Sequence, residues 1–142
     1  MNHQKRFNAA GESGWWQITL TKEGIIDPLL SHFGEKAKIF QMHGDTFEIP
    51  SGSVHLTKSS VCEAQAFSYG EKAYGLQFHL EANQELIEFA GDGAIESLEK
   101  DTSKYLVSSR QLAEKTFEKF VGFFELPERS VLTRSSEHGR GT

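Results

Sequence analysis

The sequence has one cysteine, no run of basic residues and no long apolar segment, and each absence excludes a class of protein. A single cysteine cannot form a disulfide within the chain. The net charge of −5 and the isoelectric point near 5.7 differ from the basic footprint of a nucleic-acid-binding protein. No stretch approaches the roughly 20 apolar residues of a membrane span, and no apolar stretch follows the N-terminus as in a signal peptide. We therefore expect a cytoplasmic protein with neither nucleic acid nor membrane as a partner.

A nucleophile motif is also missing. Cys62 is followed by Glu63 and lies among residues typical of strands, without the glycine-flanked turn, helix N-terminus or basic neighbour that activates a thiol. The sequence therefore favours a small, buried or semi-buried thiol at this position.

The length of 142 residues suits one domain with a real core. The hydrophobic content of 37% is low, which fits a piece of a fold or a domain with a long polar tail. Residues 1–13 are polar and are predicted to be loose. Residues 14–127 are predicted to form the domain, and the polar residues 128–142 to be disordered.

Short strands dominate the first half of the domain. Alternating apolar and β-branched residues, separated by turn residues, predict strands at 14–21, 37–42, 47–49, 54–58, 64–69 and 73–78. This close spacing indicates hairpins and a meander. The nearly continuous apolar segment 73–78 is expected to be buried on both faces. In Gly14-Trp15-Trp16, alternation predicts one tryptophan in the core and the other on a rim.

Helices are predicted to follow the strands. Asp27-Pro28 suggests a short helical turn, and Asn83 can cap a helix that runs to Ala90. A weaker helix is expected at 94–100. Ser108 has capping-box spacing to Gln111 and is expected to open a helix with apolar residues on one side. Strands first and helices afterwards indicate an α/β layered domain.

The segment 73–81 carries the clearest chemical pattern, because its apolar residues end in His79 and Glu81. Residues i and i+2 of an extended chain point to the same face, so the Glu81 carboxylate can lie beside the imidazole and fix its tautomer. A solvated histidine at a strand end is the simpler interpretation of so short a pattern.

A metal pair is a further interpretation of His79 and Glu81. The other obvious ligands are His43, Asp45, Glu48 and His55, but their spacing matches no known metal site. We therefore expect neither a metal nor a cofactor.

Residues His43-Gly44-Asp45 follow a predicted strand. Glycine and aspartate favour turns, so these residues are expected to end the strand. The functional alternative is a loop whose backbone faces a ligand, with Gly44 permitting close approach.

Several short segments, taken together and in order, resemble the class I, triad-type glutamine amidotransferases, on the branch of the GMP synthase glutaminase domain. They are Gly14-Trp15, residues 41–45 (Gln-Met-His-Gly-Asp), residues 50–52 (Pro-Ser-Gly), residues 62–70 and residues 75–81 (Gly-Leu-Gln-Phe-His-Leu-Glu). The resemblance covers roughly residues 14 to 125 and corresponds to the C-terminal half of the family's domain. It implies a partial flavodoxin-like α/β fold, with a strand meander followed by C-terminal helices. The family hydrolyses glutamine to glutamate and ammonia.

The resemblance also implies roles for individual residues. His79 matches the general base and Glu81 the acid that orients it, with Leu80 where the family most often has proline. The backbone of Gly44 and Asp45, after His43, would border the glutamine pocket. Cys62 matches a structural cysteine and not the nucleophile.

The family's nucleophilic cysteine and oxyanion hole belong to a segment that precedes these motifs. We therefore expect two members of a triad without the third, and no glutaminase activity from this chain alone. Possible partners are a separate N-terminal half, a synthetase, or a second copy of the chain. The alternatives are a non-catalytic amidotransferase-like binding module, a truncated gene product, or an unrelated small α/β protein.

Overall fold

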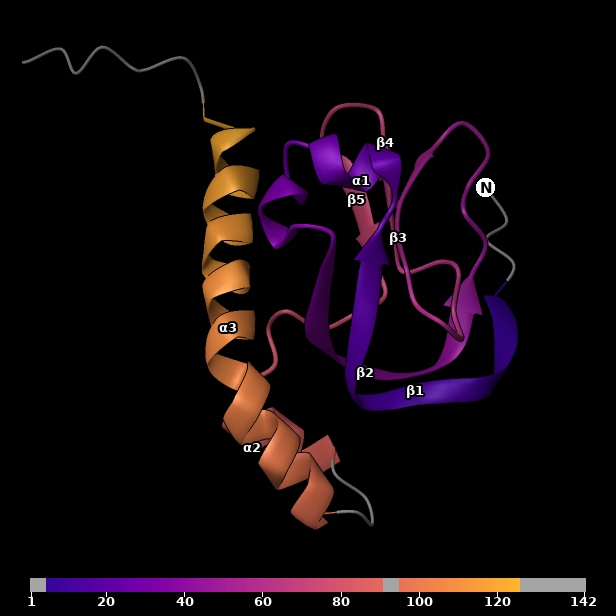
Figure 1. The fold of residues 1–142 in the computed structure, drawn as a ribbon. Helices are drawn as coiled ribbons and strands as arrows, with labels where there is room; N and C mark the ends of the chain where they lie inside the picture. Colours follow the sequence, from indigo (N-terminus) through magenta and orange to yellow (C-terminus); the bar gives the residue numbers. More distant parts are fainter. Residues whose placement is uncertain (1–4, 91–94, 126–142) are drawn as a thin grey trace, which may run out of the picture.

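The described part of the chain forms a curled antiparallel sheet with a long helix along one side (Figure 1). The computed structural model describes the backbone of residues 5–90 and 95–125 and the side chains of residues 11–89 and 96–125. The elements in chain order are β1 (Lys5–Leu20), α1 (Lys22–Ile26), η1 (Ser31–Phe33), β2 (Lys36–Phe47), β3 (Val54–Lys58), β4 (Ala66–Tyr69), β5 (Ala73–Leu76), α2 (Gln84–Ala90) and α3 (Ile95–Gly122). None of the helices in this part of the chain combines the length and the apolar character of a membrane-spanning segment.

The five strands lie in the order β2-β1-β3-β4-β5, and all neighbours are antiparallel. Strands β3, β4 and β5 form the meander that the spacing predicts. The predicted strand 54–58 has the bounds of β3, whereas β4 and β5 are shorter than predicted.

The prediction that residues 1–13 are loose is wrong for residues 5–13, which belong to β1. The expected break at His43-Gly44-Asp45 is also wrong, because β2 continues through these residues to Phe47. Pairing of β1 with β2 explains both results, because Phe7 pairs with Asp45 and Glu12 with His43, on the two sides of a register shift between Phe7 and Glu12. The sheet therefore extends past residues that favour turns in isolation. Residues 1–4 and the predicted tail 128–142 lie outside the described residues.

Strand β5 is not buried on both faces as expected. It is the edge strand of the sheet and pairs only with β4 in the described part of the chain. Ala73 is exposed and Leu76 is 38% exposed. The described residues therefore leave part of the apolar surface of this strand uncovered.

Two apolar clusters form the core. The larger one contains the buried side chains Ile18, Leu20, Leu29, Leu30, Phe33, Ile39, Leu56, Ala66 and Phe78. The smaller one is centred on Trp15, whose ring packs edge-on against Phe40 and whose Nε1 donates to Thr102 Oγ1 at 3.0 Å. Trp15 is buried and Trp16 only partly so, as strand alternation predicts.

Side-chain caps define the short helices. Thr21 accepts a hydrogen bond from the Gly24 amide and begins α1, a helix that the sequence analysis missed. Asp27 accepts from the amides of Leu29 and Leu30, so it caps a turn as predicted. Asn83 accepts from the Leu86 amide and begins α2.

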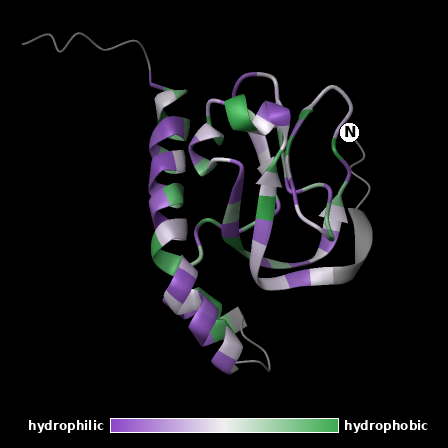
Figure 2. Cartoon of the chain, viewed as in Figure 1, coloured by the Kyte–Doolittle hydropathy of each residue, from purple (hydrophilic) through white to green (hydrophobic). Residues whose placement is uncertain are grey.

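Helix α3 is continuous, so the two separate helices expected in this region are wrong. Ser108 does not begin a helix: its hydroxyl donates to the Tyr105 carbonyl within α3. Packing of Leu98 and Tyr105 on the smaller core cluster, and of Leu112 on the larger one, explains why the helix runs through. Apolar and polar segments alternate along the helix (Figure 2), and Phe117 is 68% exposed.

His32 joins η1 to α3, since its Nε2 lies 3.2 Å from the Leu112 carbonyl oxygen and 3.0 Å from Thr116 Oγ1. Burial, reinforced by the charges of Lys119 and Lys115, lowers the pKa of His32 below its ordinary value of 6.5. The unfolded chain then binds the proton more readily than the folded chain.

The stability that depends on His32 is therefore fully present above about pH 6.5 and is lost as the pH falls toward the lower folded-state pKa. We expect the melting temperature to decrease between about pH 7 and pH 5, and to decrease less in His32→Gln. Melting curves followed by circular dichroism test this. An equal decrease of the melting temperature with pH in the two proteins would contradict this role of His32.

Candidate functional site

His79 and Glu81 lie together just after β5. The imidazole Nδ1 is 2.6 Å from Glu81 Oε1. His79 directly follows a bend and Glu81 lies in a turn, so neither belongs to the extended strand that the sequence predicts. The His79 side chain is 29% exposed and that of Glu81 is 67% exposed, so the pair is open to a ligand.

The backbone attaches this pair to the middle of β2. The His79 amide donates to the Phe40 carbonyl at 3.0 Å, and His79 Nε2 lies 3.4 Å from the Met42 carbonyl oxygen. A neutral imidazole that donates from Nδ1 to Glu81 keeps a lone pair on Nε2. The arrangement can therefore accept a proton at Nε2 while Glu81 holds the ring in place.

The segment His43-Gly44-Asp45 lies within β2, next to the strand residues that contact His79. Gly44 is exposed, and Asp45 is partly buried. The His43 side chain is turned inward: its Nδ1 is 2.9 Å from the Asp45 carbonyl oxygen, and its Nε2 is 2.9 Å from Glu12 Oε1. The structure thus places the backbone of residues 42–45 near His79 but directs the His43 ring to another partner.

Glu12 is the residue that the sequence analysis missed. It lies opposite His43 in the register of β1 and β2, and it is only 1% exposed. Its Oε1 also accepts from Gln65 Nε2 at 2.6 Å, and its Oε2 accepts from Ser59 Oγ at 2.7 Å. Gln41 extends the network by donating to Gln65. An acidic residue in a polar stretch, between glycine and serine, carried no signal of this burial.

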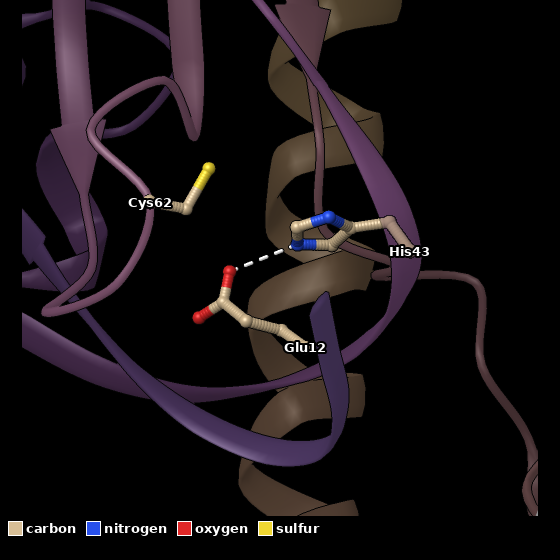
Figure 3. Close-up of side chains that lie close together, drawn as sticks. All are labelled: Glu12, His43 and Cys62. Carbon is tan, nitrogen blue, oxygen red and sulfur yellow. Dashed lines mark hydrogen bonds and ion pairs between the residues drawn. The ribbon is translucent and has the colours of Figure 1, made fainter. Parts of the chain in front are cut away.

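Cys62 lies beside Glu12 and His43 (Figure 3). It is buried, as predicted, and its sulfur is 3.1 Å from Thr46 Oγ1 and 3.6 Å from the Ala64 carbonyl oxygen. Both nitrogens of His43 face oxygen atoms. Cys62 is therefore not arranged as a nucleophile with His43 as its base.

A groove runs between β5 and α3, with a volume of about 470 Å³. Its lining is largely apolar and consists of Leu29, Tyr74, Leu76, Leu80, Glu81, Ala113, Thr116, Phe117 and Phe120. Burial, together with the neighbouring Asp27 carboxylate that accepts its hydrogen bond, raises the pKa of Tyr74 well above its usual range. Because Glu81 lines the groove, a segment bound there would lie next to the His79–Glu81 pair.

Sequence comparisons find glutamine amidotransferase-like proteins. A glutamine amidotransferase-like protein of Salmonella typhimurium is 35% identical over 77 residues, which are 54% of this chain and 32% of that protein. One component of the glutamine-hydrolyzing GMP synthase of Methanosarcina mazei is 37% identical over 76 residues, or 52% of this chain and 40% of that protein. The matched part is thus about a third to two fifths of these relatives' length. No protein-family model matches the sequence.

The fold is also that of a glutamine amidotransferase. The crystal structure of such a protein from Methylobacillus flagellatus superimposes with a TM-score of 0.72 at 19% identity, over 85% of this chain and 56% of that one. The resemblance seen in the sequence and the α/β fold class are both confirmed.

The two pairs of a histidine and a glutamate offer a matched test of stability. Removing the Glu12 carboxylate leaves the buried polar groups of His43, Ser59 and Gln65 without their partner, so Glu12→Ala is expected to lower the free energy of unfolding by about 3–5 kcal/mol. Glu81→Ala, at an exposed pair, is expected to cost about 0–1 kcal/mol. Urea unfolding of both variants measures the difference. Equal losses would show that the Glu12 network does not stabilise the fold.

Proposed function

We propose that this chain, a relative of the glutamine amidotransferase-like proteins, supplies the general base and the orienting acid for glutamine hydrolysis. The observation that carries the proposal is the 2.6 Å contact between His79 Nδ1 and Glu81 Oε1, which leaves Nε2, 3.4 Å from the Met42 carbonyl oxygen, as the ring nitrogen that can take a proton. His79 acts as the base, and Glu81 stabilises the imidazolium that forms.

The chemistry is acyl transfer. A cysteine thiol gives its proton to His79, and the thiolate attacks the glutamine carboxamide. The same proton then leaves with ammonia, and water cleaves the thioester to release glutamate. The backbone of Gly44 and Asp45 borders the glutamine, since it lies in β2 beside the Met42 carbonyl that faces His79.

The nucleophile comes from outside the described part of the chain. Cys62, the chain's one cysteine, is buried against Thr46 and lies with Glu12 and His43. The hydrogen bonds of its sulfur in the described structure go to Thr46 and to the Ala64 carbonyl, and not to His79. We therefore propose that the 142 residues by themselves do not hydrolyse glutamine.

The groove between β5 and α3 is the place where the nucleophile-bearing segment docks. Its walls are apolar, it adjoins β5, which is the edge strand of the sheet among the described residues, and it is lined by Glu81. Apolar surface of this kind gains free energy when a partner covers it. The match to the solved structure spans only 56% of that chain, which leaves a further part of the fold to fill this position.

An ammonia-release assay tests the catalytic proposal. The chain alone is expected to release ammonia from glutamine at the background rate. When the N-terminal, nucleophile-bearing part of a related glutamine amidotransferase is fused before this chain, the joined protein is expected to hydrolyse glutamine. His79→Ala in the joined protein then lowers kcat/KM by about 10³–10⁴-fold, because the thiol loses its base.

His55→Gln is the matched control, since the His55 imidazole hydrogen-bonds only to the backbone carbonyls of Thr57 and Glu63 in the described structure. It is expected to leave kcat/KM unchanged. Rapid glutamine hydrolysis by the chain alone would overturn the proposal. Glutamine binding without ammonia release, even in the joined protein, would favour the alternative of a non-catalytic binding module.

Docking in the groove predicts how the chain behaves by itself. With the groove uncovered, the chain is expected to self-associate above its monomer mass of 15.9 kDa, and the joined protein to be monomeric. Phe117→Ser combined with Phe120→Ser reduces the self-association, because both side chains line the groove.

Sedimentation velocity measures this effect. Val107→Ser is the control, because Val107 is as exposed on α3 as Phe117 but does not line the groove. A chain that is monomeric at all concentrations, or a Val107→Ser effect as large as that of the double variant, would contradict docking at this groove.

A further inference from the structure

Three side chains of metal-binding type converge at a place that is separate from the His79–Glu81 pair. Glu12 comes from β1, His43 from β2 and Cys62 from the loop between β3 and β4 (Figure 3). One ligand atom of each, a carboxylate oxygen, an imidazole nitrogen and the sulfur, all lie within 4.8 Å of one another. Glu12 and Cys62 are buried, and the His43 side chain is 6% exposed.

We propose that Glu12, His43 and Cys62 bind a transition-metal ion of the Zn²⁺ class. Thiolate, imidazole and carboxylate are the donors that Zn²⁺ takes in proteins, and the soft sulfur disfavours Mg²⁺ and Ca²⁺. The sequence analysis found no metal motif, because these ligands come from three separate segments and join only in the folded chain.

Hydrogen bonds from surrounding residues orient each of the three ligands. His43 directs Nδ1 to the Asp45 carbonyl at 2.9 Å, which leaves Nε2 for the metal. Ser59 donates to Glu12 Oε2 at 2.7 Å, and Thr46 lies 3.1 Å from the Cys62 sulfur, where its hydroxyl can donate to a thiolate. Ligands held in this way are typical of protein metal sites.

The charges and the spacing also suit a divalent ion. A glutamate and a thiolate carry two negative charges, which Zn²⁺ neutralises inside the protein. His43 Nε2 and Glu12 Oε1 are 2.9 Å apart and would separate to about 3.3 Å around a tetrahedral ion. When the ion binds, the proton shared by these two atoms and the proton of the Cys62 thiol are released to solvent.

A water molecule can take the fourth coordination position. The bound ion would connect β1, β2 and the β3–β4 loop, and it would hold residues 43–45 in place. This inference does not depend on glutamine hydrolysis.

Titration of the complete chain with Co²⁺ tests the proposal without any mutation. Co²⁺ bound to a thiolate gives an intense near-ultraviolet charge-transfer band, and Cys62 is the chain's single cysteine. With a reductant that contains no thiol, the band is expected to saturate at one Co²⁺ per chain and to disappear when Zn²⁺ is added. Saturation with Co²⁺ without this band would overturn the proposal.

Substitutions then test the individual ligands. Cys62→Ser and His43→Gln are expected to lower Zn²⁺ affinity by at least about 10-fold. His79→Gln is the matched control, because it removes the histidine of the other histidine–glutamate pair, and its Zn²⁺ affinity is expected to be unchanged. Isothermal titration calorimetry measures the affinities, and circular dichroism checks that each variant is folded. Loss of binding in His79→Gln, or unchanged binding in Cys62→Ser, would overturn the assignment.

Discussion

The buried carboxylate of Glu12 is the constraint on which the rest of the polar interior depends. A carboxylate removed from water must be fully hydrogen-bonded, and three side chains, His43, Ser59 and Gln65, provide its partners. These residues come from β2 and from the segment between β3 and β4. Satisfying one charge therefore holds β1, β2 and the β3–β4 loop in one arrangement, and it places Cys62 beside the pair.

The two histidine–glutamate pairs show how burial separates structural from chemical roles. Glu12 and His43 face each other across two strands and are shielded from solvent, so each buried side chain depends on the other as a hydrogen-bond partner. His79 is partly exposed and Glu81 is exposed, so their contact contributes little stability and can serve a ligand. The backbone of β2 connects the two, since it carries His43 and contacts His79 through Phe40 and Met42.

The apolar face formed by β5 and α3 explains several departures from the sequence-based expectations. The segment 73–78 is as apolar as a buried strand, yet β5 lies at the sheet edge with Leu76 partly exposed. Phe117 and Phe120 on α3 are likewise apolar and exposed. All of them line one groove that is also lined by Glu81. The composition of these elements fits a covered position, which agrees with our proposal that a further segment of the fold docks there.

Local patterns in the sequence determined the features that depend on neighbouring residues: the bounds of β3, the burial of one of the two adjacent tryptophans, and the cap at Asn83. They also identified His79 and Glu81, because two residues of separation suffice to bring these side chains together. Only the tertiary structure decided that Glu12 is buried and that α3 continues through Ser108. The physical reason is distance along the chain: the partners of Glu12 lie 31 to 53 residues away, and no local propensity contains them.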